Sequence, residues 1–82
     1  MSNRFHATRD DYGRPMKVLT GNGRTLGVVV TLPKVARRAN PERAYLVNDW
    51  TNPDRDAAVS YHRTLAAAKA HLVAITQGKE TA

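Results

Sequence analysis

Hydrophobic and polar residues alternate from residue 25 to residue 32, and this alternation predicts a β-strand. Because successive side chains of a strand point to opposite faces, the stretch divides into two sets. One face carries Leu26, Val28, Val30 and Leu32, and the other carries Thr25, Gly27, Val29 and Thr31. Pro33 follows directly and is expected to end the strand, because proline cannot donate a hydrogen bond to the ladder.

Further strands are predicted from shorter apolar and β-branched runs at residues 16–20, 44–50 and 57–61. The first of these is joined to the strand at 25–32 through Asn22 and Gly23, which is a strong hairpin signal.

Two registers of this hairpin compete. A two-residue turn at Asn22 and Gly23 pairs Leu19 with Leu26. A three-residue loop with Gly23 in the left-handed region pairs Val18 with Leu26 instead. The second register keeps the apolar side chains of both strands on one face, so we prefer it, with a bulge at Gly23.

The C-terminal segment predicts a helix at residues 64–77, with Thr64 as candidate N-cap and Gly78 as candidate stop. An apolar stripe at helical spacing consists of Leu65, Ala68, Leu72 and Ile75. We expect the stripe to pack on a sheet face formed by Val28, Val30, Leu46, Trp50, Val59 and Tyr61. The predicted fold is a single α+β domain over residues 1–82: an antiparallel sheet of three to five strands with one C-terminal helix packed on one face.

Both ends of the chain have weaker patterns. Residues 1–14 read either as a short edge strand at 4–8 or as a mobile arm that carries Arg4, Arg9 and Arg14. Residues 78–82 read as a loose tail.

The length and composition restrict the class of protein. A chain of 82 residues is expected to form one domain with a thin core. The absence of cysteine excludes disulfides, thiolate metal sites and cysteine nucleophiles. Its apolar runs are far shorter than the ~18–20 residues that span a bilayer, and the first residues lack the apolar segment of a signal peptide. We therefore expect a cytoplasmic protein that does not contact membranes.

The charge balance points to an acidic partner. The chain holds 13 Lys and Arg against 7 Asp and Glu, for a net charge of +6. Arginine binds phosphates and carboxylates bidentately and stacks on bases, so nucleic acid or an acidic host protein is the expected partner. The alternative is a solvated surface whose charge only maintains solubility. The candidate binding residues are Lys34, Arg37, Arg38 and Arg43 in the long loop predicted at residues 34–43, with Arg24, Arg55 and Arg63 elsewhere. Within this loop, residues 35–39 are also compatible with one short helical turn.

The sheet face opposite the predicted helix is expected to be exposed and partly apolar, unless the N-terminal segment covers it. Its candidate protein-interface residues are Val29, Thr31, Tyr45 and Val47. Such a face suits packing on another protein or on a second copy of the chain. Trp50 and Tyr61 are expected in the core, because small domains need their aromatic residues inside. The alternative is an exposed Trp50 that serves as a binding anchor at the end of its strand.

Residues for catalysis or metal binding do not form a recognisable pattern. His62 and His71 lie nine positions apart, which is not the spacing of a ligand pair on one helical turn, and His6 is remote. Ser60 has no base at a recognisable spacing. We therefore expect a non-enzymatic protein with no catalytic residues, no metal and no cofactor.

The predicted order is three strands followed by one alanine-rich helix, which opens with Tyr61, Thr64 and Ala68. This plan resembles small sheet-plus-helix DNA-binding domains. These are the ethylene-response-factor domains and the arm-site-binding domains of tyrosine integrases. The resemblance implies that the sheet enters a DNA groove. The same plan is similar to small phage-encoded proteins, some of which inhibit host enzymes.

Two functional hypotheses follow. The first is a protein that contacts nucleic acid through its arginine-rich segment. The second is a phage or mobile-element protein that binds a host protein through the sheet face, with the basic segment steering the encounter. A homodimer is compatible with both.

Overall fold

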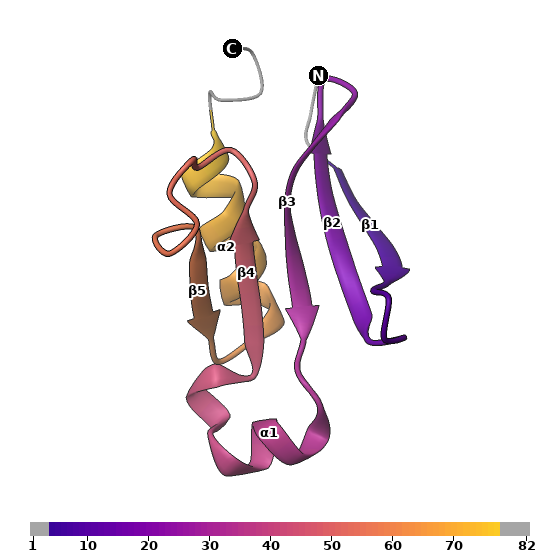
Figure 1. The fold of residues 1–82 in the computed structure, drawn as a ribbon, viewed down its shortest axis with the longest axis vertical. Coiled ribbons are helices and arrows are strands. Elements are labelled where there is room, and N and C mark those ends of the chain that lie inside the picture. The colour runs from indigo at the N-terminus through magenta and orange to yellow at the C-terminus, as the bar shows by residue number, and fades with distance from the viewer. Residues whose placement is uncertain (1–3, 78–82) are drawn as a thin grey trace.

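The computed structural model describes residues 4–77, which form a five-stranded antiparallel sheet with a helix on one face (Figure 1). The strands are β1 (Arg4–Arg9), β2 (Pro15–Gly21), β3 (Arg24–Thr31), β4 (Tyr45–Asp49) and β5 (Val59–His62). The helices are α1 (Lys34–Ala39), the single 3-10 turn η1 (Pro41–Arg43) and α2 (Leu65–Thr76). The spatial order of the strands is β1-β2-β3-β4-β5, and every neighbouring pair is antiparallel. The α+β prediction is confirmed.

The N-terminal segment joins the sheet. Residues 4–9 form the edge strand β1, which pairs with β2 from Arg4 opposite Thr20 to Arg9 opposite Pro15. This pairing fixes the segment in the sheet. Of the two alternatives that the sequence left open, the edge strand is therefore correct and the mobile arm is not. The predicted tail at 78–82 lies outside the described residues.

The turn between β2 and β3 differs from our preferred register. Asn22 and Gly23 both have positive φ, 53° and 79°, and Gly21 stands opposite Arg24. This is the two-residue turn in which both central residues are left-handed, and its twist matches that of the flanking strands. The predicted three-residue loop with a bulge at Gly23 is therefore wrong.

A β-bulge instead lies within the hairpin, at Leu26. Leu19 stands opposite Gly27, whereas Thr20 stands opposite Thr25, so Leu26 is the extra residue of β3. Leu26 is fully buried and belongs to the same core cluster as Leu19. The bulge thus adds to the core a side chain that strict alternation assigns to the opposite face.

The core lies between α2 and one face of the sheet. Its fully or almost fully buried cluster consists of Leu19, Leu26, Val29, Val47, Ala68 and Leu72. Phe5, Tyr45, Leu65, Val73 and Ile75 pack around this cluster. Gly27 lies directly beneath the helix, since a Cβ atom built there would be 2.7 Å from Cδ1 of Leu72.

The helix covers the face that we expected to be exposed. Val29 and Val47 are only 1% and 0% exposed, and Thr31 and Tyr45 on the same face are half-buried. The prediction of an exposed interface at these four residues is wrong. The reason is that residues 28–30 of β3 are all valine, so the strand is apolar on both faces and its alternation cannot specify which face receives the helix.

The helix α2 itself begins and packs as its sequence predicts. The Thr64 hydroxyl accepts a hydrogen bond from the backbone N–H of Ala67 at 3.1 Å, which confirms the N-cap. Ala68 and Leu72 of the predicted stripe are fully buried, and Leu65 and Ile75 pack beside them. The stripe is correct, but it contacts the opposite face of the sheet from the predicted one.

Candidate nucleic-acid interface

Antiparallel connectivity gathers the loops at the two ends of the sheet. One end holds the β1–β2 connection, α1 with η1, and the β5–α2 connection, toward the bottom of Figure 1. We call it the basic end. Its basic residues are Arg9, Arg14, Lys34, Arg37, Arg38, Arg43 and Arg63. Its acidic residues within the described chain are Asp10, Asp11 and Glu42. Cations from three separate connections thus outnumber acids at this end.

The α1 helix presents the densest part of the basic end. Lys34 and Arg38 are exposed, whereas Arg37 is half-buried and its Nε donates to the carbonyl oxygen of Leu32 at 3.0 Å. Arg37 and Arg38 lie in the last helical turn, where positive charge complements the helix dipole. Arg37 therefore ties the helix to the connection that follows β3, while Lys34 and Arg38 are exposed to solvent.

Arg43 lies in η1, and Arg63 contacts the same turn. The Cζ atom of Arg43 lies 4.7 Å from the centroid of the Tyr61 ring, a cation–π contact between η1 and β5. Arg63 is 3.7 Å from Glu42, and both side chains are about seven-tenths exposed. A surface pair of this length contributes little stability, so the Arg63 charge remains accessible.

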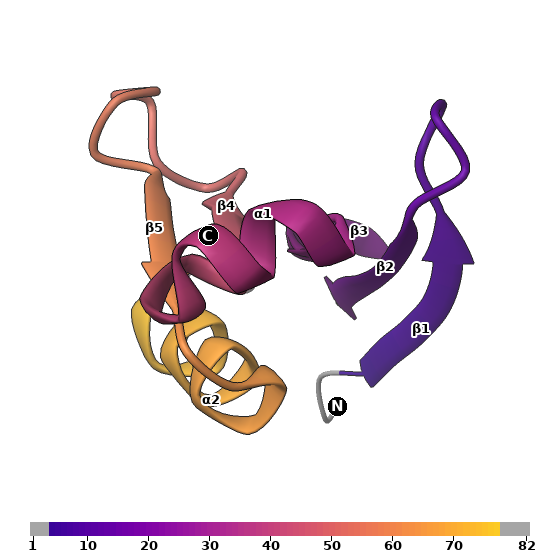
Figure 2. The same cartoon turned by 90° about the horizontal axis from the view of Figure 1, so that it is seen from below.

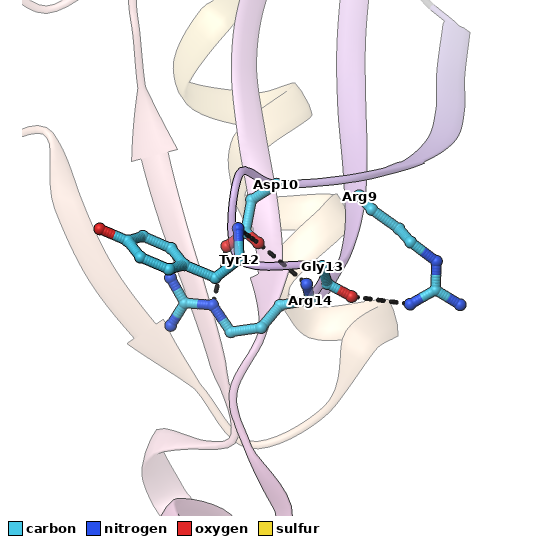
Figure 3. A network of polar contacts seen from close by, with 5 residues as sticks. All are labelled: Arg9, Asp10, Tyr12, Gly13 and Arg14. Carbon is cyan, nitrogen blue, oxygen red and sulfur yellow. Dashed lines mark hydrogen bonds and ion pairs between the residues drawn. The ribbon is translucent and has the colours of Figure 1, made fainter.

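Arg9 and Arg14 join the basic end through the β1–β2 connection (Figure 3). Asp10 accepts from the Arg14 Nε at 2.7 Å and from the Arg14 and Tyr12 backbone N–H groups at 2.9 Å. Burial raises the pKa of Asp10, but these hydrogen bonds outweigh it and hold the pKa below its ordinary value. The Arg14 guanidinium lies 5.4 Å from the Tyr12 ring, and Arg9 points away and donates to the Gly13 carbonyl at 2.7 Å.

Sequence reasoning did not include Arg9 and Arg14 among the binding candidates. They are separated from α1 by two strands along the chain, and only the pairing of β1 with β2 brings them to the same end. The available signal was the Asp10 to Arg14 spacing around Gly13, which is typical of a tight connection held by an aspartate side chain.

Arg24 and Arg55 do not belong to this group. Arg24 follows the β2–β3 turn and Arg55 lies in the β4–β5 connection, both at the opposite end of the sheet. Asp54 and Asp56 flank Arg55 there. The molecule measures 39 Å along its longest axis, so the seven predicted cations form two separate groups rather than one patch.

The sheet face opposite α2, which we call the helix-free face, carries apolar side chains. Figure 2 shows α2 on one side of the sheet and the β4–β5 connection rising on the other. Strand register places Met16, Val18, Val28, Val30, Leu46 and Tyr61 on this face. Val28 is buried by its neighbours, and Met16, Val18, Val30 and Leu46 are half-buried. We had predicted this face to lie beneath the helix.

Trp50 is exposed rather than in the core. It follows β4, has 60% of its surface accessible, and its backbone N–H donates to the Leu26 carbonyl at 2.9 Å. It lines a surface hollow of about 500 Å³. The other lining residues are Asn48, Asp49, Asn52, Arg55, Ala58 and Val59.

The histidines of β5 and α2 meet in the structure although they are distant in sequence. The ring centroids of His62 and His71 are 4.7 Å apart, and Nε2 of His62 lies 2.9 Å from the Ser60 hydroxyl. Burial lowers the pKa of His62, and the charge of His71 lowers it further. Among residues 4–77, no group of three or more His, Cys, Asp or Glu side chains is placed to hold a metal ion.

Comparisons of the chain with protein-family models, with curated proteins and with solved structures found no match. Within the described part of the chain, no helix has both the length and the apolar character that crossing a membrane requires. The two surfaces of this protein that suit binding are the basic end, by its charge, and the helix-free face, by its apolar side chains.

Proposed function

We propose that this protein binds nucleic acid, with its basic end contacting the phosphate backbone and no catalytic step. The observation that carries the proposal is the convergence of lysine and arginine from three connections on one end of the sheet. Each phosphate that a cation neutralises releases condensed counterions, so such a cluster binds with strong salt dependence.

The experiment compares charge reversal at the two ends of the sheet. The first variant combines Lys34→Glu and Arg38→Glu at the basic end, because both side chains are exposed. Arg37 is left in place, since its Nε holds the Leu32 carbonyl. The matched control combines Arg4→Glu and Arg24→Glu, two exposed residues at the far end that do not line the hollow beside Trp50, and changes the net charge by the same amount.

Binding is measured by fluorescence anisotropy of a labelled oligonucleotide over a series of salt concentrations. We expect the basic-end variant to lose at least about tenfold in affinity and to reduce the salt slope by roughly 1.4–1.8, because each of the two lost phosphate contacts contributes ~0.7–0.9 to that slope. The far-end control should bind almost as the wild type does. Equal losses in both variants would refute the basic end as the binding site, and so would an unaffected basic-end variant.

A second candidate function is docking on an acidic partner protein or a second copy of the chain through the helix-free face. It is favoured by the apolar side chains of Val18, Val30 and Leu46, which α2 does not cover. Sedimentation at increasing concentration detects self-association, and Leu46→Glu should abolish it. Capture of a host protein after nuclease treatment, lost in the same variant, would favour the phage-type hypothesis over nucleic-acid binding.

A further inference from the structure

Exposed apolar side chains follow the β4–β5 edge of the helix-free face. Tyr61 is 42% exposed, Val59 is 36% exposed and Trp50 is 60% exposed. Leu46 pairs with Tyr61 and Asn48 pairs with Val59, so the line runs along both strands. It begins where Arg43 lies over the Tyr61 ring, at the basic end, and it ends at the hollow beside Trp50. The two surfaces are therefore continuous.

The hollow beside Trp50 has the chemistry of a site for a flat, polar heterocycle. The indole supplies an exposed aromatic plane, and the amides of Asn48 and Asn52 supply hydrogen-bonding groups at the wall. The Asn52 side-chain oxygen accepts from the backbone N–H of Asp54 at 3.0 Å, which fixes the orientation of that amide. Its volume of about 500 Å³ lies within the ~300–1,000 Å³ typical of ligand pockets.

The charges around the hollow favour a neutral group over a phosphate. Asp54 and Asp56 lie in the same connection as Arg55, and Asp54 accepts from the Asp56 backbone N–H at 3.1 Å. Asp49 and Arg55 line the hollow with opposite charges, so it offers a phosphate no net attraction, whereas a nucleobase carries no charge. The attraction for phosphates is at the basic end. The path from the basic end to the hollow is about 17 Å long, counted from Tyr45 to Trp50 at ~3.3 Å per residue of extended chain.

We propose that the hollow beside Trp50 binds an unpaired nucleobase, and that the nucleic acid recognised by this protein is therefore single-stranded. The inference rests on the proposed function for its phosphate contacts. In a duplex, the base faces are covered by stacked neighbours and the pairing edges are occupied. Only an unpaired base presents a free face for stacking on an aromatic side chain together with a free edge for amide hydrogen bonds. Tyr61 and Arg43 provide a second stacking position along the strand, since bases also stack on arginine.

Trp50 is the single tryptophan of the chain, so its fluorescence reports on this hollow alone. The wild-type protein is titrated with an unstructured oligothymidylate, with a duplex of the same length, and with thymidine monophosphate at the same concentration of base. Affinity for each labelled form is measured in parallel by anisotropy. We expect the single strand to quench the fluorescence, and the duplex and the mononucleotide to leave it almost unchanged at these concentrations.

Two substitutions test the contribution of the ring. Trp50→Leu should weaken single-strand binding about tenfold, because loss of one base-stacking aromatic has an effect of this order. Trp50→Phe should retain most of the affinity, because a stacking plane remains. Duplex affinity should be the same in both variants and in the wild type. Far-UV circular dichroism checks that each variant is folded, and the high exposure of Trp50 makes large losses of structure unexpected.

Each outcome separates this inference from the proposed function. Single-strand binding without quenching, or with unchanged affinity in Trp50→Leu, overturns the base site and leaves the basic end intact. Quenching by thymidine monophosphate equal to that by the oligomer overturns the strand assignment in favour of a free nucleotide. Absence of binding by both strand forms overturns the proposed function, and the base site with it.

Discussion

Gly27→Ala tests how closely α2 approaches the sheet. Gly27 lies in β3 between Leu19 of β2 and Asp49 of β4. A Cβ atom at this position would lie 2.6 Å from the backbone oxygen of Asn48 and 2.7 Å from Cδ1 of Leu72. Both distances are well inside ordinary van der Waals contact, so alanine requires a neighbour to move.

Local propensity and packing predict opposite signs for this substitution. Replacing glycine by alanine where the backbone permits it stabilises a protein by about 0.4–1 kcal/mol, because the unfolded chain loses freedom. Gly27 needs no left-handed conformation, so this gain applies in full. Leu72 has a flexible side chain that can rotate, but the Asn48 oxygen belongs to the backbone of β4, which is paired on both sides. Overpacking of this kind costs about 1–3 kcal/mol, and we expect a net loss of about 1–2 kcal/mol.

Urea and thermal denaturation followed by circular dichroism measure the loss. In a domain of this size about 1 kcal/mol lowers the melting temperature by roughly 4–8 °C. Combining Gly27→Ala with Leu72→Ala should cost less than the sum of the single substitutions, because the methyl contact is removed. Gly23→Ala is the control: it has φ 79° and no neighbour within 4 Å, so its cost of about 1–2 kcal/mol should be independent of Leu72.

Stability of Gly27→Ala equal to or above that of the wild type would refute the close packing of α2 on β3. If the costs of Gly27→Ala and Leu72→Ala are strictly additive, the clash with Leu72 of the helix contributes nothing to the loss of stability. Only the contact with the backbone of β4 would then explain that loss.

Two further predictions concern α2 and its neighbours. Because the pKa of His62 is lowered in the folded protein, the unfolded chain binds the proton more tightly, so stability should be full above about pH 6.5 and decrease as the pH falls below it. Replacement by Gln should reduce that slope in urea midpoints measured from about pH 5 to 8, and an identical slope in the variant would contradict the assignment. Thr64→Ala should cost about 1 kcal/mol through loss of the N-cap bond to Ala67, and Thr64→Ser should restore most of it; equal midpoints for the two variants would contradict the capping role.

The elements whose signals are local were predictable. The strands around Val18, Val28 and Leu46 and the helix that begins after Thr64 occur within one or two residues of the predicted bounds. Alternation over adjacent residues and a capping side chain depend only on nearby sequence, so they can be recognised before the fold is known. The helical stripe centred on Ala68 and Leu72 is correct for the same reason.

The turn and the bulge show where local signals compete. Asn22 and Gly23 were compatible with two registers, and the apolar pattern favoured the wrong one because it assumed uninterrupted pairing after the turn. The structure combines the short turn with an extra residue at Leu26, and this keeps Val18 opposite Val28. A bulge in mid-strand changes the alternation without any proline or glycine at the bulged position to indicate it.

By itself, the sequence determined the α+β class, the order of the four central strands and the C-terminal helix, the helix cap and the excess of positive charge, because each depends on composition or on neighbours along the chain. Only the tertiary structure decided which sheet face α2 covers, that Trp50 is exposed, and that Arg14 lies at the same end as Arg38 while Arg55 does not. Those facts depend on long-range pairing and on which of two similarly apolar faces packs best. The division between the basic end and the helix-free face is therefore a property of the fold.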